Sequence, residues 1–508
     1  MSFLSRNLVA FQVAGVCALF AWLFGGLRGE YLMPVVPWVV VILLEGLICF
    51  PQRREFETTY EARERVWHDL SKDPLTWVVF CFILILAIPF FNTGLCEVCD
   101  CPAIAEGARP EPPIPFAPFC VRRMDHLNVF FWFVPSLLAL IVTKHALLKS
   151  GKRLMLRLIV WNGLGLAALG AIQQMTGAKG PFWQAMPNNI WGSHEFYSAW
   201  GYANVAGDYF TTLFCLAAGL WRWDFEQVSA EHEQIVNEGG ADKPRRNWFW
   251  RKHVMLIPAV IFFFSAINTL SRSAILIVAS MAILVFLHTF FCLFAKMKKL
   301  QRFKVGVFCM AVLAVIAFAA FAAMPKNVQK EVNTIDTTGV LNRVTGKGSY
   351  HVRVATEVWK DHLLFGCGGW GYKHFCLPKM ADKDIRSQQG VGGINVHNDY
   401  LQFLCEHGVV GFGLIVVIVM MMLMPIGHIW YALINSVRFL PSKKQPARPI
   451  ILFVMPAPVF FILLSLVGTV IHGFGDCPFR APSVLVLFFV LLAAMDGFLP
   501  RRRESGES

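Results

Sequence analysis

Long apolar runs constrain this chain more than any other feature of its sequence. Several of them reach the roughly 20 residues that a helix needs to cross about 30 Å of hydrocarbon, and strand-length alternation between turn residues is absent. Inside a bilayer a helix satisfies its own backbone hydrogen bonds. The sequence therefore predicts an all-α polytopic membrane protein. About twelve runs meet the length criterion: Leu8 to Gly26, Tyr31 to Phe50, Leu75 to Leu95, Leu127 to Leu148, Leu156 to Met175, Ala203 to Trp221, His253 to Leu270, Ala274 to Phe294, Val305 to Met324, Val409 to Ile434, Ile450 to Ile471 and Ser483 to Leu499.

The composition excludes an ordinary soluble globule. Hydrophobic residues make up 56% of the 508 residues and charged residues only 16%, whereas soluble domains carry about 25% charged residues. No short cleavable leader precedes Leu8, so we expect the first run to be retained as a membrane helix. The formal net charge of +13 would also suit a nucleic-acid-binding protein, but Lys and Arg collect on the cytoplasmic loops of membrane proteins. We expect the bilayer as a partner and no nucleic acid.

The basic connections indicate an orientation. If the N-terminus is cytoplasmic, alternating spans place these connections on the cytoplasmic side; they are Arg53 to Lys72, Lys149 to Arg157, Arg222 to Lys252, Lys296 to Lys304, Arg438 to Arg448 and the tail Arg501 to Arg503. Both termini are then cytoplasmic. We expect four regions: N-terminal membrane helices (1–195) with a Cys-rich outer loop (96–126), central membrane helices (196–324), a large outer loop containing short helices (325–408), and C-terminal membrane helices with a basic cytoplasmic tail (409–508).

Two polar features allow more than one interpretation. The segment Arg53 to Lys72 mixes both charges with aromatics at helical spacing, which fits a helix along the inner membrane surface or a solvated connector. Cysteines in the outer loops fit either zinc or disulfides, and an oxidising outer compartment favours disulfides. The candidates are Cys96, Cys99, Cys101 and Cys120 in the first loop, and Cys367 with Cys376 in the large loop.

The stretch 392–413 concentrates the candidate chemistry. His397, Asn398 and Asp399 open a predicted short helix that ends near Glu406, because Asn and Asp suit a first helical turn. Polar groups beside a membrane entry point are costly unless they face water, protein or a ligand. Taken alone, His397 would be a residue that caps a helix. Its neighbours, and the cations elsewhere on the same side, favour a functional site.

Two further outer positions carry polar groups. Asn204 lies one helical turn before Asp208 among small residues, where an interhelical hydrogen bond and a functional role are equally compatible with the sequence. Arg272 lies in the short turn Leu270 to Ala274, between two spans. It either reaches toward the interface or binds an anion. The scarcity of cations in the other short outer turns favours the anion.

The early part of the large loop, residues 342–375, predicts a helix followed by a bend. Residues 351–362 have a helical pattern with Val354 and Val358 on one face, and Arg353 adjoins that face. The glycines between 366 and 371 allow a tight bend, either as a plain turn or as a close approach to a ligand. The pattern matches no phosphate-binding glycine motif, so we favour the plain turn.

Together these features resemble the O-antigen ligase superfamily. The resemblance covers roughly residues 198–482, and its elements are an N-x-A segment (Asn204 to Ala206), a Ser-Arg-Ser turn (Ser271 to Ser273), an outer loop with Arg353, Trp359 and G-x-G (366–368), and H-N-D-Y-L-Q with E-x-G-x-x-G (His397 to Gly411). Members of this superfamily are O-antigen ligases, O-antigen polymerases and O-linked oligosaccharyltransferases. They use glycans linked to undecaprenyl diphosphate at the outer, periplasmic face of the bacterial inner membrane.

The resemblance implies roles for particular residues. His397 matches the catalytic histidine and can accept a hydroxyl proton at neutral pH. Arg272 matches the turn arginine and Arg353 best matches the loop arginine, with Arg343 as its substitute; arginines can grip diphosphate oxygens in place of a metal. We expect no cofactor and no metal. The supporting positions are Asn204, Asn398, Asp399, Glu406 and Asp476, of which the last two are expected to orient helices or an arginine.

The resemblance leaves the acceptor open. We expect an O-antigen ligase that joins O-antigen to lipid A core, with an O-antigen polymerase acting on a glycan or a protein O-oligosaccharyltransferase as alternatives. A transporter of lipid-linked glycans is less favoured, since transporters place polar groups near the membrane midplane and here they gather in one outer loop.

The orientation gives a first testable prediction. Lys347→Cys, within the large loop, should react with a membrane-impermeant thiol reagent in intact spheroplasts, because the loop is expected outside. Protection of this cysteine until the membrane is broken would refute the orientation.

Overall fold

The computed structural model describes residues 3–26, 29–94, 112–184, 196–238, 247–295, 350–379, 395–438 and 455–499, and within them it forms helices and no sheet. The elements are α1 (Phe3–Arg6), α2 (Leu8–Trp22), η1 (Phe24–Gly26), α3 (Gly29–Leu32), α4 (Val36–Ile48), α5 (Thr59–Lys72), α6 (Pro74–Ala87), η2 (Ile88–Phe91), α7 (Arg123–His145), α8 (Lys149–Met175), η4 (Pro181–Trp183), α9 (Ala203–Asn237), α10 (Trp248–His253), α11 (Leu256–Asn268), α12 (Arg272–Ala295), α16 (Tyr350–Asp361), α17 (Tyr372–Lys379), α19 (Asp399–Arg438), α20 (Ala457–His472), η6 (Pro478–Arg480), α21 (Pro482–Ala494) and η7 (Met495–Phe498).

The helices confirm a multi-pass membrane protein. Within the described residues, six helical stretches are long and apolar enough to cross a membrane: Pro74–Phe91, Arg123–His145, Lys149–Met175, Trp248–Asn268, Arg272–Cys292 and Asp399–Ala432. Shorter apolar helices cover four more of the predicted runs: Leu8–Trp22, Val36–Ile48, Ala457–His472 and Pro482–Phe498. The run Ala203 to Trp221 forms the first half of α9, and the run Val305 to Met324 lies outside the described residues. The count of twelve spans therefore stays a prediction.

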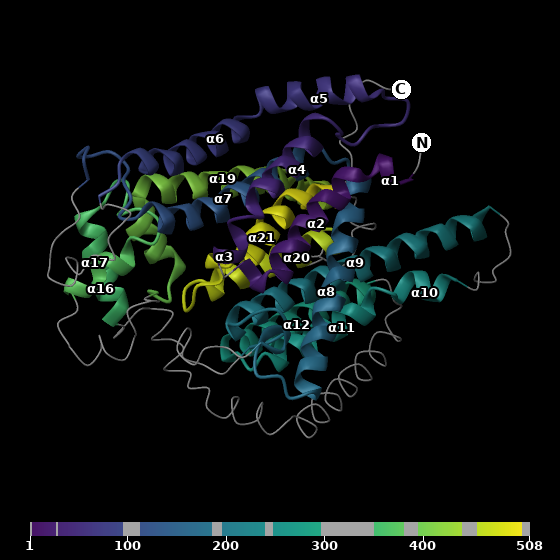
Figure 1. The fold of residues 1–508 in the computed structure, drawn as a ribbon. Coiled ribbons are helices and arrows are strands. Elements are labelled where there is room, and N and C mark those ends of the chain that lie inside the picture. The colour runs from purple at the N-terminus through teal and green to yellow at the C-terminus, as the bar shows by residue number, and fades with distance from the viewer. Residues whose placement is uncertain are drawn as a thin grey trace.

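Two helices form the centre of the bundle. Every residue of α21 is buried, and α9 is buried almost continuously from Ala203 to Leu220. A helix that is apolar on all sides belongs in a core. α9 packs against α20 and α11, α21 packs against α7, and α19 runs along α6. Figure 1 shows α16 and α17 gathered at one end of α6, α7 and α19, and we call this end of the bundle the site end.

The glycine-rich bend of the large loop turns against protein rather than toward a ligand. Gly366 and Gly368 have φ values of 71° and 80°, in the left-handed region that favours glycine. The amide of Gly368 donates to the Glu406 carbonyl at 2.9 Å, and a Cβ on Gly366 would collide with the backbone of Glu406 and His407. The bend therefore closes on the C-terminal end of the short helix that begins at Asp399, which is the structural interpretation favoured by the sequence.

The segment predicted as an amphipathic connector forms α5. Thr58 caps it: its hydroxyl accepts from the Glu61 amide, and the Glu61 carboxylate accepts from the Thr58 amide. This reciprocal capping satisfies two backbone donors at the start of the helix. Ala62 and Val66 are buried, while Tyr60 and Trp67 are exposed. Whether those exposed aromatics meet lipid or water stays a prediction.

The cysteine predictions have different outcomes. Cys96, Cys99 and Cys101 lie outside the described residues, and Cys120 is buried against the Pro89 carbonyl, to which its sulfur donates at 3.2 Å. Cys367 and Cys376 are both buried, and the bridge between them stays a prediction. The Cys376 sulfur donates to the Lys373 carbonyl within its own helix, at 3.4 Å.

Small residues allow close helix contacts in the half of the bundle around α9. A Cβ on the buried Gly163 of α8 would collide with Leu213 of α9 and lie 2.9 Å from the Phe262 ring of α11. A Cβ on Gly165, two residues along and exposed, would meet its nearest neighbour at 3.4 Å. Close approach of this kind is how membrane helices gain packing energy without a hydrophobic driving force.

These two glycines make a matched pair for a packing test. Gly163→Ala should destabilise the protein by about 1–3 kcal/mol, the usual range for an overpacked core. Gly165→Ala should be neutral or stabilising by up to about 1 kcal/mol, because alanine favours a helix over glycine. Thermal unfolding of the detergent-solubilised protein measures both. Equal effects of the two substitutions would contradict the observed packing of α8 on α9 and α11.

Candidate functional site

The predicted H-N-D helix begins at Asp399, two residues after a strained residue. His397 has φ of 52°, and Asn398 caps the helix by accepting the Leu401 amide at 3.0 Å. A non-glycine residue in the left-handed region costs on the order of 1–3 kcal/mol and persists only where its surroundings hold it. α19 then continues to Arg438 with a break at Gly408, whose φ is 62°. The short helix and the following membrane helix are thus separated where the sequence predicts.

The H-N-D-Y segment is fixed along its whole length against the end of α20 and the loop that joins α20 to α21. The Asp399 amide donates to the Gly473 carbonyl at 2.9 Å, and the Asp399 carboxylate accepts the Phe479 amide at 2.8 Å. The Asn398 amide group donates to the Phe474 carbonyl at 3.2 Å. Tyr400 donates to the Val470 carbonyl at 2.6 Å. These bonds hold the backbone that places His397, so Asn398 and Asp399 act as positioning residues.

Asp476, in the α20–α21 loop, is the centre of the polar network. The Tyr202 hydroxyl donates to both of its oxygens, at 2.8 and 2.9 Å, and Asn204 donates to one of them. His397 Nδ1 lies 3.4 Å from Oδ1, and His472 Nε2 lies 3.9 Å from Oδ2. The carboxylate is 5% exposed. One buried acid therefore joins side chains from α9, α19 and α20.

The contacts keep Asp476 ionised. Burial alone would raise its pKa, but the hydrogen bond from His397, the positive charge of His472 and the Tyr202 hydroxyl together hold the pKa well below its usual range. Burial and the neighbouring carboxylate in turn raise the pKa of Tyr202. The phenol therefore stays protonated and serves as a donor.

The ionised carboxylate assigns the proton on His397. A carboxylate only accepts hydrogen bonds, so Nδ1 of His397 carries the hydrogen that faces Asp476. In the neutral imidazole, Nε2 then holds the lone pair. The side chain of His397 is 56% exposed, whereas its partner is almost fully buried. The arrangement is that of an oriented base whose outer nitrogen can accept a proton.

The Ser-Arg-Ser turn is tied to the same region through a second histidine. His472 Nε2 lies 2.9 Å from the Ser273 hydroxyl, and His472 Nδ1 lies 3.1 Å from Asp208 Oδ1. Ser271 caps α12 by accepting the Ala274 amide at 3.3 Å. Arg272 is exposed between these two held serines, at the N-terminus of a long helix. Backbone amides and the helix dipole at that end favour an anion beside the arginine.

The loop arginine lies on α16. Arg353 is exposed, whereas Val354 and Val358 on an adjoining face of the helix are buried. Two residues earlier, His351 lies near the site: burial and the charge of His397 hold the pKa of His351 below its usual range. Arg343 lies outside the described residues. The structure thus brings α16 close to His397 without deciding between the two arginines.

Glu406 contacts an arginine that the sequence did not single out. Its carboxylate accepts Arg480 Nη2 at 2.7 Å, and the Arg480 guanidinium lies 4.7 Å from the centre of the Trp370 ring. Both charged side chains are largely buried. A buried charge is stable when it is paired, so this pair joins α19 to the loop before α21.

Three side chains are close enough to be tested as a metal site. His397, Asp476 and Cys477 offer one ligand atom each, all within 4.8 Å of one another. Burial, followed by the charges of Asp476 and Asp399, raises the pKa of the Cys477 thiol well above its usual value. Metals bind the thiolate, so a metal here would have to displace that proton. The absence of a resident metal stays a prediction.

Several residues of the network were missed or underrated from sequence. Tyr202 and His472 were not considered, and Asp208 was noted only as a neighbour of Asn204. His472 is the last residue of α20 and Asp476 lies four residues later in the loop, so helical spacing offers no signal that links them. Tyr202, two residues before Asn204, offers no local signal either.

Comparison with known families gives one match. Residues 257–416 match the model of a family described as O-antigen ligase. The matched residues include the Ser271–Ser273 turn, Arg343, Arg353 and His397, whereas Asn204 and Asp476 lie outside them. The comparison with curated proteins gave no match. The resemblance seen in the sequence is therefore confirmed over residues 257–416.

The ionised state of Asp476 predicts a pH-dependent stability. A depressed pKa stabilises the fold above the unfolded pKa of about 3.9, and this contribution is lost as the pH falls toward the folded pKa. Asp476→Asn should lower stability at pH 7 by about 1–3 kcal/mol, the cost of disturbing a buried hydrogen-bond acceptor. The difference from the wild type should narrow below about pH 4.

Thermal unfolding in detergent across this pH range measures the effect. The control is Asp361→Asn, since Asp361 is 45% exposed and pairs with Lys379 at 2.8 Å; we expect a change under about 1 kcal/mol. A deficit in Asp476→Asn that is the same at every pH would show that the carboxylate is not ionised in the folded protein.

Proposed function

We propose that this chain, whose residues 257–416 match the O-antigen ligase family, moves a glycan from undecaprenyl diphosphate to an acceptor hydroxyl with His397 as the base. The family supports a lipid-linked glycan glycosyltransferase in a multi-pass membrane protein. The observation that carries the assignment of the base is the contact between the exposed His397 and the buried, ionised Asp476.

The proposed reaction is a direct displacement. His397 Nε2 takes the proton of the acceptor hydroxyl, and the hydroxyl oxygen bonds to the anomeric carbon of the glycan. The bond between that carbon and the diphosphate oxygen breaks, and the polyprenyl diphosphate leaves with the electron pair. Asp476 stabilises the imidazolium that forms, because its fixed negative charge faces Nδ1.

The departing diphosphate needs positive charge at the same end of the bundle. Arg272 supplies it from the N-terminus of α12, with Arg353 or Arg343 from the large loop as the second cation. A guanidinium offers several fixed donors and holds two phosphate oxygens at once. With this charge available from the arginines, the proposed transfer needs no divalent metal.

The acceptor and the location complete the proposal. We place the site on the periplasmic face of the bacterial inner membrane with both termini in the cytoplasm, following the basic connections. The acceptor is lipid A core, which makes the enzyme an O-antigen ligase. Transfer to a growing glycan would instead identify a polymerase, and transfer to a protein hydroxyl would identify an O-oligosaccharyltransferase. Transport of the lipid-linked glycan without transfer would identify a transporter.

Purified protein, a synthetic polyprenyl-diphosphate glycan and lipid A core test the mechanism. His397→Ala should slow transfer by about a hundredfold to ten-thousandfold, the scale of general base catalysis. Binding of the donor should persist, because the proposed donor contacts are the arginines. Near-normal transfer by His397→Ala would remove the base assignment.

The same assay separates the role of the turn arginine. Arg272→Lys keeps the charge but loses the planar group, so both donor affinity and rate should fall. EDTA should leave the wild-type rate unchanged. Activity that is lost in EDTA and restored by magnesium or manganese would replace the arginine mechanism with a metal-assisted one.

A further inference from the structure

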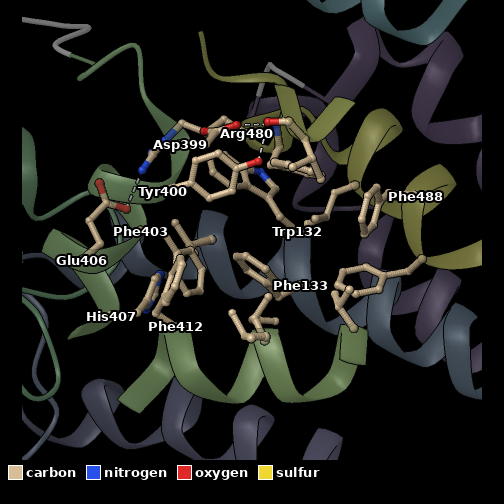
Figure 2. A pocket seen from close by; sticks show the side chains of 18 of the residues that line it. Trp132, Phe133, Asp399, Tyr400, Phe403, Glu406, His407, Phe412, Arg480 and Phe488 are labelled. Carbon is tan, nitrogen blue, oxygen red and sulfur yellow. Dashed lines mark hydrogen bonds and ion pairs between the residues drawn. The ribbon is translucent and has the colours of Figure 1, made fainter. Parts of the chain in front are cut away.

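A cavity lies beside the H-N-D-Y segment, and Asp399 and Tyr400 of that segment line it. It has a volume of about 260 Å³ and lies between α7, α19, α20 and α21. Its walls are mostly aromatic and aliphatic, with Asp399, Glu406 and Arg480 at one end (Figure 2). No step of the proposed transfer uses it.

The wall of this cavity contains polar atoms that lack partners. Within the described part of the chain, Trp132 Nε1, His407 Nε2 and two guanidinium nitrogens of Arg480 have no hydrogen-bond partner. Trp132 is 6% exposed and His407 5% exposed. Buried polar groups are nearly always hydrogen-bonded, and an unsatisfied one is costly. An indole N–H and a guanidinium N–H can only donate, so their missing partner is an oxygen acceptor.

The far end of the cavity reaches the surface of the bundle along α19, a candidate membrane span. Val416 and Met420 of α19 line it and are 43% and 60% exposed. From Phe412 to Met420 the helix rises about 12 Å, and the cavity is lined along this stretch by apolar side chains. A hydrocarbon chain can therefore enter from the bilayer and lie with its oxygen-bearing end toward Trp132 and Arg480. Complete small-molecule sites usually have about 300–1,000 Å³, so the volume suits one chain rather than a whole lipid.

Geometry separates this cavity from the proposed diphosphate site. Val470 of α20 lines the cavity, while His472 of the same helix contacts Ser273 beside Arg272. Residues two apart on a helix point about 200° apart, so the two sites lie on opposite sides of α20.

We infer that the cavity binds one acyl chain of the acceptor lipid, with the ester or amide oxygen of that chain accepting from Trp132 and Arg480. This inference rests on the proposed function, since it assigns the donor to Arg272 and leaves the opposite side of α20 to the second substrate. Under this inference the acceptor is a lipid, and that lipid lies beside the helix that follows His397.

Photocrosslinking tests the inference without requiring catalysis. The full-length protein in lipid nanodiscs is given either a lipid A analogue with a diazirine in one acyl chain or a polyprenyl diphosphate with a diazirine in its chain. Val416→Trp should fill the cavity and reduce crosslinking of the acyl probe by about tenfold, equivalent to about 1.4 kcal/mol of binding. Crosslinking of the polyprenyl probe should not change.

The adjacent residue provides the control. Val417 is 42% exposed on the same helix and does not line the cavity, so Val417→Trp should leave both probes unaffected. Trp132→Phe removes one donor and should weaken acyl crosslinking by about two- to tenfold, the range for a single hydrogen bond. Three results would each overturn the inference. They are a loss of polyprenyl crosslinking in Val416→Trp, an equal loss of acyl crosslinking in Val416→Trp and Val417→Trp, and acyl crosslinks that lie outside the cavity.

The two proposals fail in distinguishable ways. If the acyl probe labels the cavity but no variant or wild-type protein transfers a glycan, the cavity assignment stands and the proposed function fails. If transfer to lipid A core proceeds at the wild-type rate in Val416→Trp and the cavity is never labelled, the cavity assignment fails alone.

Discussion

One buried carboxylate holds together the parts of the chain that form the site. Asp476 receives hydrogen bonds from Tyr202 and Asn204 at the start of α9 and from His397 at the start of α19, and it lies just beyond α20. These elements are distant in sequence, and the arrangement of each depends on the same acceptor. Without it, the left-handed backbone at His397 would lose the contact that directs its imidazole.

The membrane setting explains why the charged groups around the site are paired with groups of opposite charge or held by several donors. In a largely apolar bundle an unpaired charge is far more costly than in water. Asp476 has several donors, Glu406 has Arg480, and Asp208 has His472 and Thr469. Each set also connects two or more helices. The groups that shape the site are therefore the same ones that fix the ends of the helices. The exposed His397 side chain is supported by this network of buried groups.

Local patterns predicted much of this arrangement, and distant contacts escaped them. Periodicity and capping residues predicted the helix at Asp399, its end near Glu406 and the turn around Arg272, because each depends on neighbouring residues. The pairing of the H-N-D-Y segment with residues 470–479 has no local signature, so Asp476 was underrated and Tyr202 was missed.

The central claim is that His397 and Asp476 act as one catalytic unit. A double-mutant cycle with His397→Ala, Asp476→Asn and the combined variant tests it most directly, with transfer rate and donor binding measured on folded protein. If the carboxylate acts through the imidazole, the combined variant should be no slower than His397→Ala, because effects within a unit are not additive. The account is contradicted if Asp476→Asn slows transfer by the same factor in the presence and absence of His397, so that the two fold-decreases in rate multiply in the combined variant.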